Sequence, residues 1–137
     1  MATAARIPTT PATPRRIALV AAGGALGSTT RWAVGKAIVP THGVPWALLV
    51  VNLVGSAVLA LALAESGRVQ KRAGLLVDFV GTGFCGGLTT FSSLAVATAK
   101  LTRDGRPGVG LGFLAGSVIA GIVIAALVSF ALSESRS

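Results

Sequence analysis

The stretch Gly81–Leu94 reads Gly-Thr-Gly-Phe-Cys-Gly-Gly-Leu-Thr-Thr-Phe-Ser-Ser-Leu and lies in the middle of an otherwise apolar segment. Such a composition is poor material for a membrane helix, because each interior Gly costs up to about 1 kcal/mol and the β-branched Thr pair adds to that cost. In hydrocarbon, backbone that leaves the helix is tolerated only where it is buried in protein or lines a wet cavity. The stretch therefore predicts a membrane helix that is broken near its centre, with carbonyl and hydroxyl groups available for function.

The whole chain has the composition of an integral membrane protein. It has 137 residues, of which 53% are hydrophobic and 12% are charged, and its mean hydropathy is +0.80. A soluble domain carries about twice that share of charged residues. The formal net charge of +8 raises the question of nucleic-acid binding. The basic residues, however, stand at the ends of apolar blocks, where Lys and Arg meet lipid headgroups, so we expect the lipid bilayer of the cell membrane as partner and no nucleic acid.

Four apolar windows are long enough to cross a bilayer, which takes about 20 residues. They lie at about 17–39, 45–64, 74–99 and 108–132, and short polar connectors separate them. Residues 1–14 are rich in Ala, Thr and Pro and are expected to form a disordered tail, and residues 15–137 are expected to form a single membrane domain. The predicted fold class is all-α and multi-pass, with four transmembrane helices of which the third is broken.

The Lys and Arg residues are divided almost evenly between the two sides of the predicted bundle. Seven lie on the side of the termini and the second connector and five on the other side: Arg6, Arg15, Arg16, Arg68, Lys71, Arg72 and Arg136 against Arg31, Lys36, Lys100, Arg103 and Arg106. Because this asymmetry sets orientation, so weak a bias is compatible with insertion in both directions and with an antiparallel, dual-topology dimer. A single orientation set by Arg15 and Arg16 is the alternative, and the count does not decide between them.

Rows of small residues at helical spacing run along the first and the last span. They are Gly23 and Gly27 in the first, and Gly108, Gly112, Gly116 and Ala120 in the last. Such rows let helix backbones approach closely in lipid. The sequence does not say whether these seams join helices within one copy or between two copies. Four spans enclose little interior, however, and this favours an obligate dimer.

The polar residues at membrane depth are neutral donors together with one arginine. Arg31 in the first span either snorkels to the interface or offers a fixed positive charge that attracts anions or anchors a partner backbone. Asn52 in the second span either joins helices or donates its amide N–H to a passing anion. The third and fourth spans contribute hydroxyls and one aromatic ring: Thr89, Thr90, Phe91, Ser92, Ser93 and Ser117.

Carboxylates are missing from the centres of the predicted spans. The four acidic residues stand at span ends or in connectors: Glu65, Asp78, Asp104 and Glu134. Coupled transport of a cation generally relies on an intramembrane Asp or Glu, so the pattern favours a path for a small anion. It argues against a small four-span multidrug exporter, which would need a first-span carboxylate. The sequence also has no catalytic triad, metal-ligand cluster or phosphate loop, and we do not expect an enzyme.

Three segments resemble signatures of the Fluc (CrcB) fluoride channel family. The segment Gly83-Phe-Cys-Gly-Gly-Leu-Thr-Thr-Phe-Ser-Ser93 is similar to the family's third-span signature. Val51-Asn-Leu-Val-Gly55 resembles its second-span motif, and Gly23-Gly-Ala-Leu-Gly-Ser-Thr-Thr-Arg-Trp32 its first-span motif. The resemblance implies a homodimer of two antiparallel copies with two pores. Each pore would pass fluoride by passive electrodiffusion and so lower cytoplasmic fluoride.

The resemblance also implies roles for single residues. Asn52 matches a pore-lining asparagine, Arg31 a vestibule arginine, and Phe91 the first of two phenylalanines whose ring edges face the ion. Other members of the implied anion path are Thr90, Ser92 and Ser117. A structural Na⁺ at the dimer centre would be held by the backbone carbonyls of Gly86 and Thr89.

One position departs from the family pattern. The second phenylalanine, three residues after the first, is Leu94 here. Leu94 shares a helical face with Phe91 and so stays on the implied anion path, but it offers no ring quadrupole. This leaves two alternatives open: altered conduction through a homodimer, or service as a non-conducting partner subunit in a heterodimer with a Phe-containing paralogue.

Overall fold

The computed structural model describes residues 13–66 and 73–134, and every regular element in these two ranges is a helix. The elements are α1 (Pro14–Ala37), α2 (Trp46–Ser66), α3 (Ala73–Leu76), the π-helix η1 (Val77–Cys85), α4 (Gly86–Leu88), α5 (Phe91–Arg103) and α6 (Pro107–Glu134). Three stretches are long and apolar enough to cross a membrane: Trp46–Ser66, Gly74–Arg103 and Pro107–Ser133. The prediction of an all-helical protein with several membrane spans is confirmed.

Helix α1 starts earlier than the predicted first span. The Thr13 hydroxyl accepts a hydrogen bond from the Arg16 backbone N–H at 3.4 Å, and Pro14 stands in the first turn. Both features favour a helix start, because the cap satisfies a free N–H and Pro lacks one. Pro14, which the sequence assigned to the tail, therefore belongs to the helix. The rest of that tail, residues 1–12, lies outside the described residues.

The remaining boundaries differ from the predicted spans by a few residues. Helix α2 continues to Ser66 and α5 to Arg103, beyond the predicted ends at 64 and 99. Glu65, Lys100 and Arg103 in these last turns end the apolar window without ending the helix, since Glu, Lys and Arg are good helix formers. Most of the second connector, residues 67–72, lies outside the described residues.

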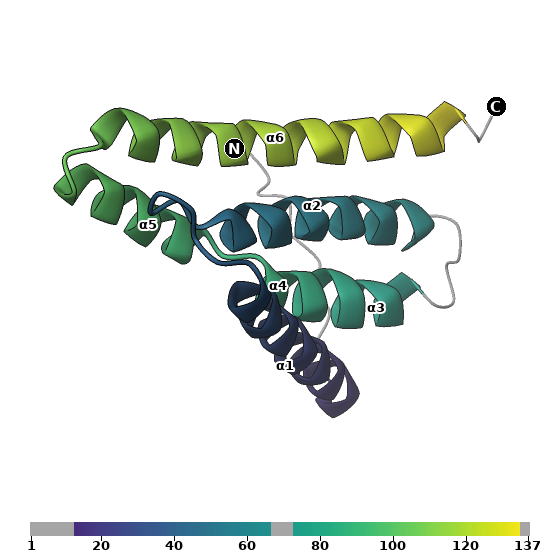
Figure 1. Ribbon diagram of the computed structural model, residues 1–137. Coiled ribbons are helices and arrows are strands. Elements are labelled where there is room, and N and C mark those ends of the chain that lie inside the picture. The colour runs from purple at the N-terminus through teal and green to yellow at the C-terminus, as the bar shows by residue number, and fades with distance from the viewer. Residues whose placement is uncertain (1–12, 67–72, 135–137) are drawn as a thin grey trace, which may run out of the picture.

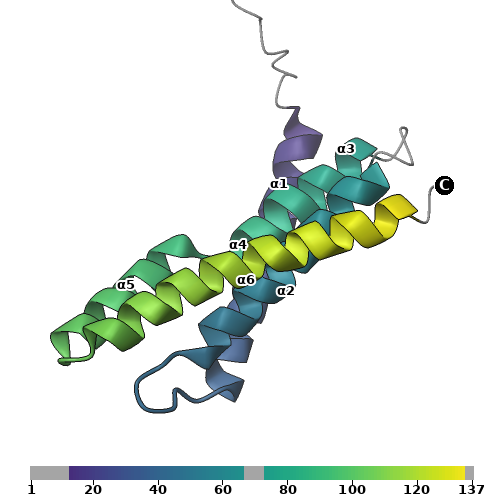
Figure 2. The same ribbon diagram turned by 90° about the horizontal axis from the view of Figure 1, so that it is seen from above.

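The helices are stacked in layers. Figure 1 shows α6 above α2, α2 above the segment from α3 to α4, and α1 crossing below this segment at a steep angle. Helix α5 turns back into α6, and the two lie side by side as a hairpin (Figure 2). Helix α1 packs mainly against η1 and α4, whereas α6 packs against α2 and α5. The segment η1–α4 therefore lies between α1 on one side and α2 on the other.

Glycines bring α1 into direct backbone contact with this segment. A Cβ atom built on Gly27 would lie 2.2 Å from the carbonyl oxygen of Phe84, and one on Gly23 would lie 2.2 Å from that of Phe79. From the opposite side, a Cβ atom on Gly87 would lie 2.4 Å from the carbonyl oxygen of Gly24. No side chain fits at these points. The small-residue row of the first span is thus a seam within one copy.

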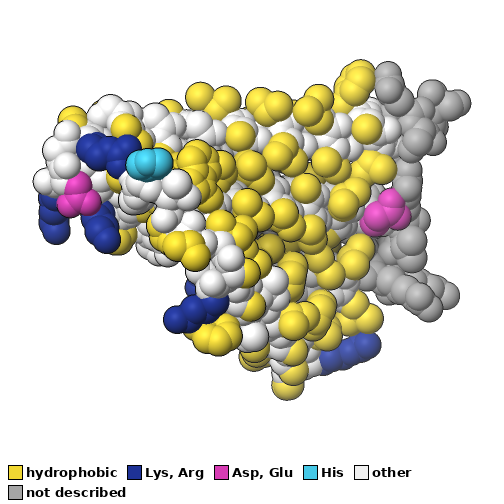
Figure 3. Space-filling model, viewed as in Figure 1, with side chains coloured by type: hydrophobic (Ala, Val, Ile, Leu, Met, Phe, Trp, Pro, Cys, Tyr) yellow, Lys and Arg dark blue, Asp and Glu magenta, His cyan; other side chains and the backbone are white. Residues whose placement is uncertain are grey.

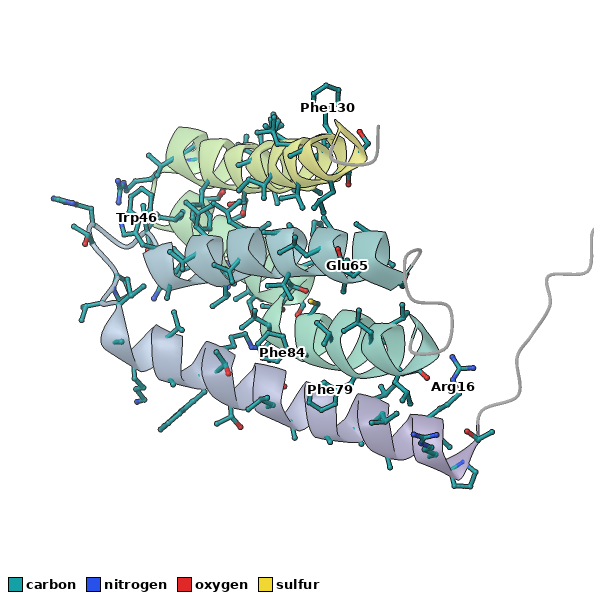
Figure 4. The ribbon with its side chains drawn as sticks, turned by 90° about the vertical axis from the view of Figure 1, so that its right-hand side faces the viewer. Arg16, Trp46, Glu65, Phe79, Phe84 and Phe130 are labelled. Atoms are coloured by element: carbon teal, nitrogen blue, oxygen red, sulfur yellow. The ribbon has the colours of Figure 1, made fainter. Side chains whose placement is uncertain are left out.

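The small-residue row of α6 is different. Cβ atoms built on Gly108, Gly112 and Gly116 would meet nothing within 4 Å. The contacts of α6 with its own copy are made by another face, where Gly110 approaches the Thr98 carbonyl of α5. Figure 4 shows Phe130, near the end of α6, pointing away from the other helices. Within the described residues, the three glycines of the row on α6 pack against no neighbour.

The surface agrees with a protein that sits in lipid. Hydrophobic side chains cover most of the face seen in Figure 3, and Lys and Arg side chains gather at the end where α5 turns into α6. At this end the guanidinium of Arg106 donates to the backbone carbonyl of His42 and so ties the α5–α6 turn to the α1–α2 loop. Gly43 adopts a φ of +76°, which favours glycine, and completes that loop.

Candidate functional site

Two extended residues separate α4 from α5. Thr89 has φ −83° and ψ 154°, and Thr90 has φ −157° and ψ 118°. The Thr89 N–H closes the last turn before the interruption by donating to the Cys85 carbonyl at 2.9 Å. The Thr90 hydroxyl starts the next helix by accepting from the Ser93 N–H at 3.2 Å. The Thr pair is therefore placed by ordinary helix-end chemistry, because a β-branched hydroxyl residue is a good N-cap and a weak helix former.

The amide of Asn52 on α2 bridges this interruption. Its Oδ1 accepts from the Thr90 backbone N–H at 2.9 Å, and its Nδ2 donates to the Thr90 carbonyl at 3.4 Å. In an unbroken helix the Thr90 N–H would instead donate to the Gly86 carbonyl. Asn52 thus substitutes for the missing helical partner, and this is the helix-joining interpretation. One of its two N–H groups remains for a ligand, so the donor interpretation is compatible with the same geometry.

Arg31 approaches the interruption from α1. Its Nη1 donates to the Thr89 carbonyl at 3.4 Å, and the side chain is half-buried. Of the two sequence interpretations, anchoring to backbone therefore describes its position better than snorkelling to the interface. The guanidinium also places a positive charge beside Thr89.

Hydroxyls cluster at the start of α5. The Thr90 Oγ1 lies 3.1 Å from the Ser92 Oγ and donates to the Ser93 Oγ at 3.2 Å. Because Thr90 donates to Ser93, the Ser93 hydroxyl proton remains available for another acceptor. The cluster can therefore present an O–H donor at its outer end.

A groove of about 870 Å³ runs along the side of the interruption that faces α2 and α6. Its polar lining comes from α2, η1, α6 and the interruption itself, and includes Asn52, Ser56, Thr82, Thr89, Thr90, Ser117 and Ser129. The rest of the lining is mostly apolar. The groove therefore offers hydroxyls and an amide in apolar surroundings, and the lining residues include no charged side chain.

Three of the six groove hydroxyls donate to carbonyls of their own helices. Ser117 donates to the Phe113 carbonyl at 2.6 Å, Ser56 to that of Asn52 at 2.9 Å, and Thr89 to that of Cys85 at 2.8 Å. Each bond joins residue i to residue i−4, which is a common arrangement in apolar helices. An anion binds to hydrogen-bond donors. These hydroxyls would therefore have to leave their helical carbonyls, by rotation about χ1, before they could donate to an anion.

Phe91 and Leu94, which match the two phenylalanine positions implied by the family resemblance, differ strongly in exposure. The Phe91 side chain is 69% exposed and lies at the edge of the groove. Leu94 also reaches the groove but is only 2% exposed, because it packs in a cluster with Val44 and Phe113. Leu94 is thus a core residue of the contact between α2, α5 and α6.

Two predicted path residues line a different cavity. Arg31 and Ser92 border a recess of about 600 Å³ near the α1–α2 loop, and neither borders the groove. The predicted anion path is therefore divided between two cavities. Asn52, Thr90, Phe91, Leu94 and Ser117 meet in the groove, and the Thr90 hydroxyl links them to the recess through Ser92 and Ser93.

The predicted cation ligands lie beside the groove. Gly86 and Thr89 both border it, and a Cβ atom on Gly86 would meet nothing within 4 Å. Among residues 13–66 and 73–134, no three His, Cys, Asp or Glu side chains gather closely enough to hold a metal ion. A cation at this place would depend on backbone and hydroxyl oxygens.

An ion pair that the sequence did not reveal ties α1 to η1. The Asp78 carboxylate is bound by the Arg16 side chain through two hydrogen bonds of 2.7 and 2.8 Å. Asp78 is 5% exposed. The pair joins residues 62 positions apart, and no local pattern links them. The π-helical winding of η1 also had no sequence signal, although the glycines within it were noted.

Comparison with known proteins covers most of the chain. Residues 18–129 match the family model described as CrcB-like protein, Camphor Resistance (CrcB). A protein of Gloeobacter violaceus named Fluoride-specific ion channel FluC is 41% identical over 111 residues, which are 79% of this chain and 88% of that protein. A protein of the same name from Thermus thermophilus is 40% identical, with coverages of 82% and 90%.

A third relative gives the same result. Fluoride-specific ion channel FluC 1 of Streptomyces coelicolor is 37% identical over 116 residues, which are 84% of this chain and 75% of that protein. The family match begins within α1 and ends within α6, and it includes the interruption at Thr89 and Thr90. The chain therefore belongs to the CrcB-like family.

Proposed function

We propose that this protein is a fluoride channel, which lets fluoride leave the cytoplasm by passive electrodiffusion. The named relatives support the ion, since each is called a fluoride-specific ion channel. The groove supports the mechanism, because its polar lining consists of neutral groups that can donate to an anion without holding it too tightly. No catalytic chemistry is involved.

The observation that carries the proposal is the junction of Asn52 with Thr90. It places an amide N–H and a hydroxyl cluster beside a groove in an apolar protein. Amides and hydroxyls that are not fully paired at membrane depth are costly, and they mark ion paths when they are present. A cation path would be expected to show carboxylates, and none lines the groove.

The driving force needs no coupled ion. Hydrogen fluoride crosses membranes as a neutral weak acid and ionises in a less acidic cytoplasm. A negative interior potential then drives the anion outward with about 2.3 kcal/mol per charge per 100 mV. A narrow, selective channel is therefore enough to lower cytoplasmic fluoride.

The membrane arrangement that we propose has four spans, with the third broken at Thr89 and Thr90. Helix α1 has 24 residues, and at 1.5 Å per residue this gives about 36 Å, more than the hydrocarbon thickness of about 30 Å. Its basic start is compatible with a span, because Arg16 is paired with Asp78. The extended pair can exist at membrane depth because Asn52 and Arg31 satisfy its backbone groups.

A structural Na⁺ at the interruption belongs to the same proposal. The Gly86 carbonyl fits this role, since its usual helical donor, the Thr90 N–H, is engaged by Asn52 instead. The Thr89 carbonyl fits less well, since the Arg31 guanidinium already donates to it. Gly86 and Thr89 would supply hard oxygen ligands, and the ion's charge would lie beside the anion path.

We further propose that the working unit is an antiparallel homodimer. The unpaired glycine row on α6 and the exposed ring of Phe91 are features that a second copy would cover. The almost even Lys and Arg distribution supports insertion in both directions. In such a dimer each groove would be closed by the partner.

Efflux from liposomes tests the function. The purified chain is reconstituted into vesicles loaded with potassium fluoride, and valinomycin is added while a fluoride electrode follows release. We expect rapid fluoride release, with vesicles loaded with chloride serving as the selectivity control. Release only after a Phe-containing paralogue is added would favour the partner-subunit alternative, and no release in either case would refute the channel.

Cysteine labelling tests the topology separately. Ser66→Cys at the end of α2, in a Cys85→Ser background, places one thiol at the second connector. A membrane-impermeant reagent should label about half of the copies from each side if both orientations occur. Labelling from one side alone would contradict the antiparallel dimer and leave the channel proposal intact.

A further inference from the structure

Helix α5 depends on contacts at its two ends for its position in the copy. It packs mainly along α6 and approaches α2, which carries Asn52, at few points. At its start the Thr90 backbone is held by Asn52 through bonds of 2.9 and 3.4 Å. The extended residues Thr89 and Thr90 form a natural hinge, because a few φ and ψ angles can absorb a rotation of the helix that follows. The position of α5 therefore also depends on what holds its far end.

The far end of α5 closes in a Schellman motif. The Arg106 N–H donates to the Leu101 carbonyl at 2.9 Å, and the Gly105 N–H donates to the Thr102 carbonyl at 3.1 Å. Gly105 has a φ of +76°, the left-handed conformation that this motif requires. The backbone of Arg106 is thereby fixed to the last turn of α5, so a contact made by its side chain holds the whole helix.

The Arg106 side chain reaches from the end of α5 to the α1–α2 loop, where its guanidinium donates to the backbone carbonyl of His42. His42 and Gly43 both have a positive φ, of +52° and +76°. Few residues other than glycine adopt this conformation, so a bond to the His42 carbonyl helps to hold the turn. A Cβ atom on Gly43 would lie 3.8 Å from Nη1 of Arg106 and 3.7 Å from Cδ2 of Leu101. The loop therefore lies against the end of α5.

The same turn places Val44 in the core. The Val44 N–H donates to the Thr41 carbonyl at 3.0 Å, and the Thr41 N–H donates to the Val44 carbonyl at 3.3 Å. Val44 is 7% exposed and packs with Leu94 and Phe113. Leu94 lies about one helical turn after Thr90. A continuous set of contacts therefore runs from the Schellman motif, through the turn, to the interruption.

We propose that Arg106 is a positioning residue for the anion path, and that it holds α5 so that the Thr90 hydroxyl cluster stays beside Asn52. The inference rests on the proposed fluoride conduction. Arg106 does not border the groove, and it acts through the α1–α2 loop. Without its bond to His42 the turn is held less firmly, and Val44 packs less steadily in the core. The start of α5 can then rotate about the extended pair and move its hydroxyls away from the groove.

Amide hydrogen exchange of the full chain in detergent micelles tests the position of α5 without any ion. In Arg106→Gln the amides of residues 91–103 should exchange about tenfold faster, the factor expected from the loss of one hydrogen bond with a charged donor. Arg103→Gln is the matched control, because Arg103 is exposed at the same end of α5 and its loss removes the same charge. Its exchange should stay near that of the unmodified chain. Equal exchange in the two variants would overturn the proposal.

Liposome efflux measures the consequence for conduction. Arg106→Gln should release fluoride more slowly than Arg103→Gln, by up to the same factor. The deficit should persist in about 1 M of an impermeant salt, where the Debye length is about 3 Å, because its cause is geometric. A deficit that salt removes would show that the charge of Arg106 matters rather than its bond to the loop, and would overturn the proposal. Equal release from the two variants would overturn it as well.

Arg106→Lys keeps the charge but loses the planar fork with which a guanidinium holds an acceptor. It should lie between Arg106→Gln and the unmodified chain in both measurements. If Arg106→Gln does not fold, Arg106→Lys is compared with Arg103→Lys, and the same outcomes decide. Failure of the unmodified chain to release fluoride would count against the channel itself, whereas the exchange comparison would still test whether Arg106 holds α5.

Discussion

Gly86 and Gly87 are adjacent in the chain, yet they face opposite sides of the molecule for opposite reasons. Gly87 is pressed against α1, where a Cβ atom would lie 2.4 Å from the Gly24 carbonyl oxygen. Gly86 faces the groove, where a Cβ atom would meet nothing within 4 Å. Gly86 leaves open space and exposes its backbone to the groove, whereas Gly87 allows two backbones to touch.

The same division holds for the whole segment η1–α4. Its face toward α1 is sealed by close backbone packing, and the opposite, open face lines the groove with Gly81, Thr82, Cys85 and Gly86. A sealed face fixes the position of the segment in lipid, where helices associate by close packing rather than by the hydrophobic effect. The open face can then line a cavity without the segment losing its place. Close packing and the groove therefore lie on different sides of the same segment.

Gly27→Ala on the sealed side should have the largest effect. The new methyl group would lie 2.2 Å from the Phe84 carbonyl oxygen and 2.8 Å from the Leu88 nitrogen, and backbone cannot rotate away as a side chain can. We expect a loss of at least about 3 kcal/mol of stability, seen as aggregation in thermal unfolding followed by size-exclusion chromatography.

Gly35→Ala is the control within the same helix. A Cβ atom on Gly35 would meet nothing within 4 Å. The effect of Gly35→Ala should therefore reflect only the higher helix propensity of Ala, and stability should rise by up to about 1 kcal/mol. Equal behaviour of the two variants would mean that α1 is not held by backbone contact.

Two variants of Asn52, which lines the groove, can separate its support of the Thr90 backbone from its proposed part in conduction. Asn52→Leu removes both partners of the Thr90 backbone, and leaving these groups unpaired costs about 1–3 kcal/mol each. Asn52→Asp keeps an acceptor for the Thr90 N–H but replaces the donor with a negative charge. We expect the Leu variant to lose stability and flux together.

The Asp variant should unfold near the temperature of the unmodified chain and yet lose fluoride flux by at least about tenfold, because of charge repulsion in a site of low dielectric constant. Thermal unfolding and liposome efflux are measured on the same preparations. Undiminished flux through Asn52→Asp would show that the groove is not the anion path.

Leu94→Phe should have a smaller effect, because Leu94 reaches the groove but packs in the core cluster with Val44 and Phe113. Introducing the aromatic residue that the family resemblance implies at this position adds volume next to Val44 and Phe113, where Leu94 is 2% exposed. Overpacking of this kind costs about 1–3 kcal/mol. We expect a lower unfolding temperature and no gain in flux. Higher flux at unchanged stability would instead show that Leu94 limits conduction.

Gly86→Ala should have the smallest effect of the series. Gly86 has helical angles, φ −62° and ψ −36°, and open space around it, so the change in stability should stay within about 1 kcal/mol. The carbonyl is retained, and flux should stay near that of the unmodified chain. A collapse comparable with that of Gly27→Ala would refute the distinction between the two faces.

Local chemistry made much of the site predictable. The Thr89–Thr90 interruption, the hydroxyls beside it and the amide of Asn52 could be recognised because helix propensity and burial cost act on each residue separately. Their meeting in one groove could not, since Asn52 and Thr90 are 38 residues apart and their hydrogen bonds depend on how α2 packs. The separation of Arg31 and Ser92 into a second recess depended on packing in the same way.

The sequence by itself determined that this chain is helical and apolar, that it crosses a membrane several times, and that the segment Gly81–Leu94 contains an interruption, because composition and propensity are properties of single segments. Only the tertiary structure decided which glycine row seals a contact, since Gly27 and Gly112 are alike until a neighbouring backbone approaches one of them. It also decided that Leu94 belongs to the core and that Arg16 holds Asp78. Contacts between distant segments are set by the packing of whole helices, and no local pattern encodes them.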